Sequence, residues 1–271
     1  FFILFEPDLA GITCMFTMTH TRMIRIAQRI KEHSKDIVIF AGGVHPTSSA
    51  ELILKEEKSI NFISLYEGDQ SIPQLIDYFN KKNNDIKSLR QIGILINNKY
   101  YQTDGRIHPE GKYLNIKPDY GDLKLEKYSN FGEIGAYRFW WKKNTIASTV
   151  LSNRGCRARC SFCSVRNFNG KGVRGRSFAS VIDELSYLKE YHGVNHVMWL
   201  DDDLLFDRER TIGMFNEMVK RNLEITWDAS NGIIASALKD EVLDAAAESG
   251  CIGMHFGIES GSDKILREVH K

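Results

Sequence analysis

Apolar runs alternate with amphipathic stretches along roughly the first 80 residues. Residues 10–16, 36–41 and 62–66 are short apolar runs that end in polar or glycine-containing segments, a pattern typical of buried strands. Residues 22–33 and 71–80 instead repeat apolar side chains at helical spacing, which predicts helices with one buried face. Buried strands joined by helices indicate a parallel sheet with helices on both faces.

A second series of strands and helices begins at about residue 146. Its strands are predicted at residues 146–151, 196–200, 224–229 and 251–257, and its helices at residues 177–191, 208–221 and 239–249. This alternation is the rhythm of a βα barrel or of an open α/β sheet. Gly250 follows the third helix directly, at the position where a C-terminal capping glycine is common.

The stretch between the two series has a different pattern. Residues 92–96 and 99–102 predict a small hairpin, and the segment up to residue 145 contains proline, glycine and many aromatic residues, as in a packed linker. The predicted fold class is α/β, with a Rossmann-like parallel-sheet domain followed by a partial (β/α) barrel. The expected domains are residues 1–90, then the hairpin and linker at 91–145, then the barrel at 146–271.

Composition narrows the class of protein further. The 271 residues are 42% hydrophobic and 26% charged, as in a globular chain, and 5 prolines and 5 cysteines exclude collagen-like and disulfide-scaffold proteins. The 36 basic and 35 acidic residues leave a net charge of +1, so no global field attracts nucleic acid or an acidic membrane. No apolar run reaches ~18 residues, so we expect no membrane-spanning helix. Residues 1–5 (FFILF) have the pattern of the middle of a buried element, and the sequence does not begin with Met. We therefore expect a fragment truncated at both ends.

Three of the five cysteines are clustered. Cys156, Cys160 and Cys163 fall within eight residues, whereas Cys14 and Cys251 stand alone. An odd count with this clustering argues against a disulfide framework and for a reducing compartment, so we expect a cytoplasmic protein. The cluster follows a predicted strand, and the C-terminal ends of the strands form the active face of a barrel.

Three closely spaced thiolates suit a soft metal or an iron–sulfur cluster. A structural zinc site requires a fourth ligand, and the nearest histidines, His192 and His196, are distant from the cysteines in the sequence. A disulfide would leave one thiol over, and chance placement is the weakest explanation. The residues therefore favour a three-cysteine cluster site and leave zinc as the alternative.

The spacing Cys156-x3-Cys160-x2-Cys163, with the aromatic Phe162 before the last cysteine, resembles the signature of the radical S-adenosylmethionine (radical SAM) superfamily. The resemblance implies that the three cysteines hold three irons of a [4Fe–4S] cluster, whose fourth iron is left for SAM. An electron passed to SAM then yields a 5′-deoxyadenosyl radical. The protein supplies orientation and excludes water.

Acidic residues at two other predicted strand ends fit the same resemblance. It implies that Asp201 and Asp202 accept the SAM amino group, that Asp203 caps the next helix, and that Glu259, assisted by Ser260, accepts the ribose hydroxyls. Phe162 would also contact SAM. Without the resemblance, the aspartates would be a solvated strand end with a helix cap, and residues 256–262 a glycine-rich turn.

Residues 154–176 contain seven basic side chains and no acidic one. Local positive charge would lower thiol pKa values and favour an anionic cluster, but the segment could equally bind an anionic substrate or RNA, or be a solvated loop. Gly170-x-Gly172-x-x-Gly175 matches the dinucleotide-binding pattern. We reject that interpretation because no strand immediately precedes the glycines and no βαβ unit surrounds them.

The N-terminal half resembles the cobalamin (B12)-binding domain that precedes the barrel in one class of radical SAM proteins. The residues that carry this resemblance are Pro7, Asp8, Ile12 and Thr13, residues 41–47 (AGGVHPT) and residues 66–69 (YEGD).

The resemblance implies that Thr13, Gly42 and Gly43, small residues at strand ends, admit the nucleotide tail of the corrin, since glycine suits a close approach to the backbone. Alternatively, the glycines only turn the chain. The Asp-x-His-x-x-Gly motif that supplies an axial histidine in many cobalamin proteins is absent, and His20 and His45 are weak candidates for that role.

The combined resemblance implies a radical SAM enzyme that abstracts hydrogen from an unactivated carbon of a small molecule, with methyl transfer as the first prediction. Ring closure or rearrangement is the second. An RNA-modifying, methylthiotransferase-like enzyme is disfavoured because the N-terminal half has no second cysteine triad, so nucleic acid is an unlikely partner. A non-catalytic zinc or cobalamin module is a further alternative. The expected partners are the substrate and an electron donor such as a flavodoxin or ferredoxin.

Overall fold

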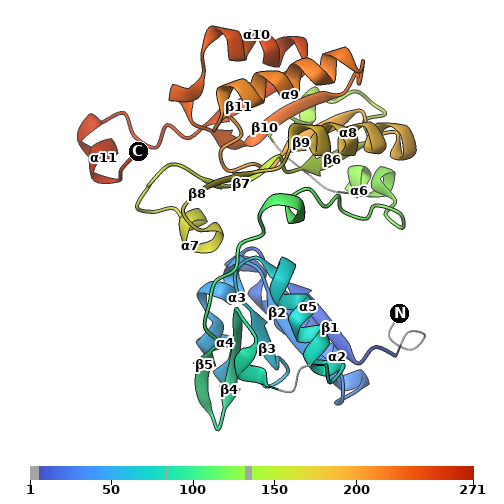
Figure 1. Ribbon diagram of the computed structural model, residues 1–271, viewed down its shortest axis with the longest axis vertical. Helices are drawn as coiled ribbons and strands as arrows, with labels where there is room; N and C mark the ends of the chain where they lie inside the picture. The colour runs from blue at the N-terminus through green and yellow to red at the C-terminus, as the bar shows by residue number, and fades with distance from the viewer. Residues whose placement is uncertain (1–5, 83–84, 132–135) are drawn as a thin grey trace. The chain divides into compact units, whose positions relative to one another are not determined.

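The computed structural model describes residues 6–82, 85–131 and 136–271, so the apolar residues 1–5 lie outside the described residues. The chain divides into two compact units, Phe1–Pro109 and Glu110–Lys271 (Figure 1). The hairpin that was expected to follow the first domain belongs to the first unit, and the linker residues from Glu110 onward belong to the second. The domain limits 1–90, 91–145 and 146–271 stay a prediction.

The first unit is built on a five-stranded sheet with the strand order β1-β2-β3-β4-β5. The first three strands are parallel, and the hairpin adds two antiparallel strands at one edge. The strands are β1 (Leu9–Thr13), β2 (Val38–Gly42), β3 (Phe62–Ser64), β4 (Ile92–Ile96) and β5 (Lys99–Gln102).

Two separate cores confirm that helices cover both faces of this sheet. Along β2, Ile39 and Ala41 pack with the first group of helices, whereas Val38 and Phe40 contact the core around Leu75 of α5. Both faces are apolar because every second side chain of a strand points the same way. The helices are α2 (His20–His33), α3 (Val44–Ser48), α4 (Ala50–Glu56) and α5 (Gly68–Phe79).

The second unit contains a four-stranded parallel sheet with the order β11-β10-β9-β6. The four strands follow one another across the sheet in their order along the chain, as in a partial βα barrel (Figure 1). The strands are β6 (Ala147–Val150), β9 (His196–Trp199), β10 (Thr226–Ile233) and β11 (Cys251–Phe256), and the intervening helices are α8 (Phe178–His192), α9 (Arg208–Lys220) and α10 (Asp240–Glu248).

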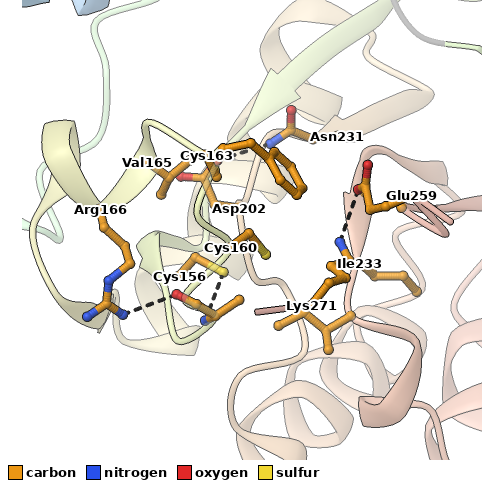
Figure 2. A pocket seen from close by; sticks show the side chains of 15 residues that line it. Cys156, Cys160, Cys163, Val165, Arg166, Asp202, Asn231, Ile233, Glu259 and Lys271 are labelled. Carbon is orange, nitrogen blue, oxygen red and sulfur yellow. Dashed lines mark hydrogen bonds and ion pairs between the residues drawn. The ribbon is translucent and has the colours of Figure 1, made fainter. Parts of the chain in front are cut away.

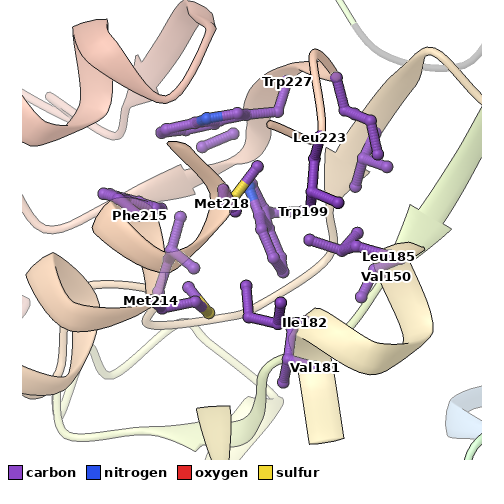
Figure 3. Close-up of a cluster of buried hydrophobic side chains, with 14 of the residues drawn as sticks. Val150, Val181, Ile182, Leu185, Trp199, Met214, Phe215, Met218, Leu223 and Trp227 are labelled. Carbon is purple, nitrogen blue, oxygen red and sulfur yellow. The ribbon is translucent and has the colours of Figure 1, made fainter. Parts of the chain in front are cut away.

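A single apolar core joins these strands to their helices (Figure 3). Trp199 and Trp227 are fully buried, and the Trp227 ring stacks on Phe215 of α9 with ring centroids 4.7 Å apart. Gly250 has the positive φ of 97° expected of a capping glycine, and a Cβ there would lie 2.7 Å from the carbonyl oxygen of Ile225.

The sequence pattern missed a short antiparallel strand pair between β6 and α8. The pair consists of β7 (Asn153–Cys156) and β8 (Gly172–Gly175), with α7 (Val165–Asn169) between them. Gly155 has a φ of 90°, and a Cβ there would lie 2.5 Å from the carbonyl oxygen of Gly172, so this pairing requires glycine. The cysteine cluster therefore begins on a strand, where a loop was predicted.

The remaining helical segments are short. They are α6 (Leu125–Phe131), α11 (Asp263–Glu268) and the 3-10 turns Thr17–Thr19, Ile86–Ser88, Gly111–Tyr113, Arg138–Trp140 and Ala235–Ala237. As expected, none of the helices in the described part of the chain has the length and apolar character needed to cross a membrane.

Truncating the core of the second unit tests this packing. Leu185→Ala should lower the free energy of unfolding by about 2–5 kcal/mol because Leu185 has no solvent exposure and its loss leaves a cavity. Urea unfolding followed by tryptophan fluorescence measures this unit alone, since all 4 tryptophans lie within residues 110–271. Leu243→Ala is the matched control, because Leu243 is 45% exposed and should cost much less. Equal losses would contradict the assigned core.

Candidate functional site

A pocket of about 330 Å³ lies at the carboxyl ends of the strands of the second unit (Figure 2). It collects side chains from the cysteine loop, from the ends of β9, β10 and β11, and from the last residue of the chain. Its walls are Cys156, Ala158, Cys160, Phe162, Cys163, Val165, Arg166, Asp202, Asn231, Gly232, Ile233, Ile234, Gly257, Glu259 and Lys271.

All three clustered cysteines line this pocket. Cys156 ends β7, and the turn that follows is closed by the amide of Cys163, which donates to the carbonyl oxygen of Cys160 at 3.2 Å. The Cys156 sulfur accepts the Ala158 N–H at 3.4 Å, and burial raises the pKa of its thiol. Cys163 is exposed, and the other two are partly buried.

The donor set of the loop fits a soft metal centre. Three thiols on one turn face one cavity, which leaves room for a fourth, non-protein ligand. Within the described residues, no three His, Cys, Asp or Glu side chains are already gathered at metal-binding distance. The three sulfurs would therefore have to converge when a cluster binds.

Asp202 is the aspartate of the Asp201–Asp203 triplet that lines the pocket. One carboxylate oxygen accepts the side-chain amide of Asn169 at 3.0 Å, and the other accepts that of Asn231 at 3.5 Å. Burial raises the pKa of Asp202, while both amide contacts act in the opposite direction. The two amides hold the carboxylate in place at the pocket wall.

Asp201 does not have the geometry expected of a SAM ligand. Its side chain is 1% exposed and is not part of the pocket wall. Both carboxylate oxygens accept the backbone N–H of Ser152, at 3.1 and 3.0 Å, and the Ser152 hydroxyl donates at 2.5 Å. The SAM contact expected of Asp201 stays a prediction, and in this structure its acceptor sites bind the turn between β6 and β7.

Asp203 was expected to cap the next helix, and this prediction is wrong. The cap of α9 is Asp207, whose side chain accepts the backbone N–H of Arg210 at 3.0 Å. Asp203 is fully buried and instead pairs with Arg157 of the cysteine loop, with 3.0 Å between Nε and Oδ2.

Glu259 lines the pocket as expected, but Ser260 is not one of the pocket-lining residues. Glu259 has a φ of 60°, and its carboxylate pairs with the Lys271 ammonium at 3.2 Å. The Ser260 hydroxyl accepts the backbone N–H of Ser262 at 3.1 Å, which fixes the turn after β11. The ligand contact expected of Ser260 stays a prediction. Phe162 lines the pocket and is 57% exposed.

Much of the basic segment is bound internally rather than free to bind RNA. Arg176 is buried and forms an ion pair with Glu184 at 2.5 Å, while Arg157 binds Asp203. Arg166 donates to the carbonyl oxygen of Ala158 at 3.1 Å. The basic character of residues 154–176 therefore serves largely to fix the loop, which weakens the solvated-loop interpretation.

In the first unit, the predicted small residues gather at the carboxyl edge of the sheet. Thr13 ends β1 and is exposed, and Gly42 ends the neighbouring β2. Gly43 has a φ of 104°, and a Cβ there would lie 2.7 Å from the carbonyl oxygen of Cys14, whereas a Cβ on Gly42 would make ordinary contacts of 3.4 Å or more.

Two histidines lie beside this edge. His45 accepts or donates a hydrogen bond to His20, with 2.9 Å between Nε2 and Nδ1, and its own Nδ1 lies 3.2 Å from the Thr17 hydroxyl. Burial and the neighbouring His20 lower the pKa of His45. The sequence singled out both histidines without indicating that they form a pair.

Sequence reasoning missed four pocket or positioning residues: Asn169, Asn231, Arg157 and Lys271. Neither asparagine lies in a motif that was recognised, and their shared partner, Asp202, is far from both along the chain, in the segment after β9. The nearest available signal was the position of Asn231 near the end of a barrel strand, where functional residues concentrate.

Comparison with known families identifies both units. The family model of the radical SAM superfamily matches residues 150–271. The model of the B12-binding domain matches residues 2–76. The chain is therefore a B12-binding radical SAM protein, as the cysteine motif and the glycine-containing strand ends had suggested.

Similar proteins place the chain within this class. The uncharacterized methyltransferase PH0819 of Pyrococcus horikoshii is 28% identical over 98% of this chain and 55% of its own length. The anaerobic magnesium-protoporphyrin IX monomethyl ester cyclase of Rubrivivax gelatinosus is 28% identical over 98% of this chain and 46% of its own.

A solved structure shows the same fold. The radical S-adenosylmethionine methyltransferase TsrM of Kitasatospora setae, with tryptophan and a SAM analog bound, superposes with a TM-score of 0.78 at 17% identity. The superposition covers 96% of this chain and 50% of that one. The chain thus spans about half the length of the relatives it matches.

The buried Asp201 should make stability depend on pH in a defined direction. Burial raises its pKa from 3.8 to about 6, so its contribution to folding is fully present below about pH 4 and is lost as the pH rises through about 6. Wild type should therefore lose unfolding free energy relative to Asp201→Asn as the pH rises from about 4.5 to about 6.5. Above that pH the difference between the two proteins should stay constant. Urea unfolding at several pH values measures it. A difference that shifts in favour of wild type with rising pH would show that the Ser152 contacts outweigh burial.

Proposed function

We propose that the protein is a cobalamin-dependent radical SAM methyltransferase that acts on a small molecule. The observation that carries the proposal is the pocket in which Cys156, Cys160 and Cys163 face Asp202 and Glu259 at the carboxyl ends of parallel strands. Thiols that suit an iron–sulfur cluster and acids that suit a cationic, ribose-containing ligand thus share one cavity.

Each residue has a stated role in this proposal. The three cysteines would hold a [4Fe–4S] cluster, which with bound SAM supplies the one-electron chemistry that yields a 5′-deoxyadenosyl radical. Asp202 accepts the SAM amino group, and Glu259 accepts the ribose hydroxyls. Phe162, which lines the same pocket, contacts SAM.

The protein's own side chains prepare this site. The side-chain amides of Asn169 and Asn231 donate hydrogen bonds to Asp202. The remaining acceptor sites of this carboxylate are available to a ligand in the pocket. Glu259 must exchange its contact with Lys271 for the ribose, which is feasible because the carboxylate is 36% exposed. Ile233 and Ile234 give the pocket apolar walls that limit the access of water.

Cobalamin would bind at the carboxyl edge of the first unit, with Thr13, Gly42 and Gly43 next to the nucleotide tail. Methyl transfer is the preferred reaction because methyltransferases are among the relatives that match 98% of this chain. Ring closure is the second, because a cyclase also matches 98% of it. An RNA substrate is disfavoured, because several basic side chains are bound internally.

The proposal includes a redox partner and a compartment. A flavodoxin or ferredoxin would supply the electron, since the chemistry begins with reduction of the cluster. Three clustered free thiols also require a reducing environment, which supports a cytoplasmic location.

Removing one cysteine of the motif should abolish the cluster. Cys160→Ser in anaerobically reconstituted protein should lose most of the roughly four irons and four sulfides per chain expected of wild type, because three thiolates are needed to hold the cluster. Iron, acid-labile sulfide and zinc analyses measure the outcome. Cys251→Ser is the matched control, since Cys251 is a free thiol outside the pocket and should keep full iron content. Stoichiometric zinc without sulfide in wild type would instead indicate a structural zinc site.

Alanine variants of Gly42 and Gly43 distinguish a role in cobalamin binding from a role in the backbone conformation. Gly42→Ala should leave the fold intact, because its Cβ meets only ordinary contacts, yet weaken cobalamin binding by about tenfold or more if the corrin tail approaches the backbone there. Gly43→Ala should destabilise the first unit even without cobalamin, because of its φ and its contact with Cys14.

Titration with hydroxocobalamin and thermal unfolding of the apoprotein provide the two measurements. Unchanged cobalamin binding by a folded Gly42→Ala variant would remove Gly42 from the proposed site.

A further inference from the structure

The pair Arg157–Asp203 connects the cysteine loop to the segment after β9. Arg157 is the residue directly after Cys156, and its Nε lies 3.0 Å from Oδ2 of Asp203. The backbone N–H of Arg157 donates to the same oxygen at 3.3 Å. One carboxylate thus binds both the main chain and the side chain of a single loop residue.

The guanidinium of Arg157 is also bound at its other end. Its two terminal nitrogens donate to the carbonyl oxygens of Phe206 at 3.0 Å and Leu205 at 3.1 Å. The planar fork of arginine can reach three acceptors in fixed directions, whereas a lysine ammonium on a flexible stem cannot reproduce that arrangement. The segment 203–206 therefore forms a cradle of three acceptors for Arg157.

Among the described residues, the Asp203 carboxylate binds Arg157 alone. It is fully buried, and its Oδ1 accepts no hydrogen bond from any described residue. Burying a carboxylate is costly unless a charged partner compensates it, and the partner here is the residue next to a proposed cluster ligand. Without Arg157, the carboxylate would remain buried and uncompensated.

The contact acts one peptide bond away from a proposed ligand. The N–H that Asp203 binds belongs to the peptide group linking Cys156 to Arg157, so the carboxylate fixes the orientation of that peptide group at the end of β7. We propose that Arg157 and Asp203 are positioning residues that hold the Cys156 end of the loop in the conformation required to receive an iron–sulfur cluster. The part that concerns the cluster rests on the proposed function.

The chain offers a matched control pair. Arg221 and Asp183 also form an Arg–Asp contact, at 2.8 Å, but between exposed side chains of α8 and the end of α9. Asp183→Ala should therefore change none of the loop properties. Asp203→Asn is the conservative variant, because an amide oxygen can still accept both hydrogen bonds from Arg157.

The first measurement does not need a cluster. In the anaerobic apoprotein, the rate of iodoacetamide alkylation at each cysteine is followed by mass spectrometry. Arg157→Lys should alkylate Cys156 several times faster than wild type, whereas the rate at Cys251 should not change. The Asp203 carboxylate raises the pKa of the Cys156 thiol, so Asp203→Ala is compared with Asp203→Asn, which removes the same charge, and should alkylate Cys156 faster than that variant. Arg157→Lys keeps the positive charge, so a faster rate reports the loss of the fork rather than of the charge.

The second measurement uses the reconstituted protein. Loss of iron to a chelator should be about tenfold faster in Arg157→Lys and Asp203→Ala, the lower end of the effect of removing an outer partner of a metal ligand. Asp203→Asn should retain most of the wild-type behaviour, and the double variant should be no worse than Asp203→Ala alone.

The outcomes are distinguishable. Unchanged alkylation of Cys156 in both variants, or equal acceleration at Cys156 and Cys251, would overturn the positioning role, because the second result indicates general loosening of the fold. If alkylation behaves as expected but wild type takes up no iron and sulfide, the contact positions the loop and the proposed function fails. If wild type holds a cluster and the variants release iron at its rate, the positioning role in cluster binding fails and the proposed function stands.

Discussion

The contact between Asp201 and the backbone of Ser152 is the constraint on which the site depends. It joins the end of β9 to the turn where the chain leaves the barrel sheet, between Val150 and Asn153. Arg210 of α9 reinforces the turn by donating to the carbonyl oxygen of Ser152 at 2.9 Å. Because the strand that carries Cys156 begins directly after this turn, its direction is fixed before the cysteine loop starts. A carboxylate that can accept several hydrogen bonds at once suits this role, and those bonds offset part of the cost of its burial.

Three consecutive aspartates have three different sets of side-chain partners. Asp201 faces the β6–β7 turn, Asp202 faces the pocket, and Asp203 faces the cysteine loop. All three carboxyls have a pKa raised by burial, and their neighbours differ: a serine backbone, two amides and an arginine. Only the amide-bound carboxylate keeps access to a ligand. Composition shows three acids at a strand end, but the direction of each side chain depends on backbone geometry that sequence spacing does not encode.

The sequence predicted the parts of the molecule that depend on periodicity and missed those that depend on long-range contacts. The parallel strands, the long helices and the capping Gly250 follow from local patterns, and the structure confirms them. The three cysteines of the motif line one pocket, and the motif could be recognised because they lie within eight residues of the sequence. By contrast, β7 and β8 consist largely of polar residues and glycine, without the apolar run that marks the other strands, and their pairing depends on Gly155. Asn231 was missed for a related reason, since its partner Asp202 lies 29 positions away.

Both units place reactive or small residues at the carboxyl edge of parallel strands, but they do so with different chemistry. In the second unit the edge bears thiols and acids whose orientation is set by buried ion pairs and hydrogen bonds. In the first unit it bears Gly42, Gly43 and the His20–His45 pair, and the room at Gly42 is not required by the protein's own packing. The φ of Gly43 and its contact with Cys14 already require glycine at that position. The fold does not require glycine at position 42, so a bound ligand is the better explanation for Gly42. Gly42 is therefore a stronger indication of a ligand at this edge than Gly43.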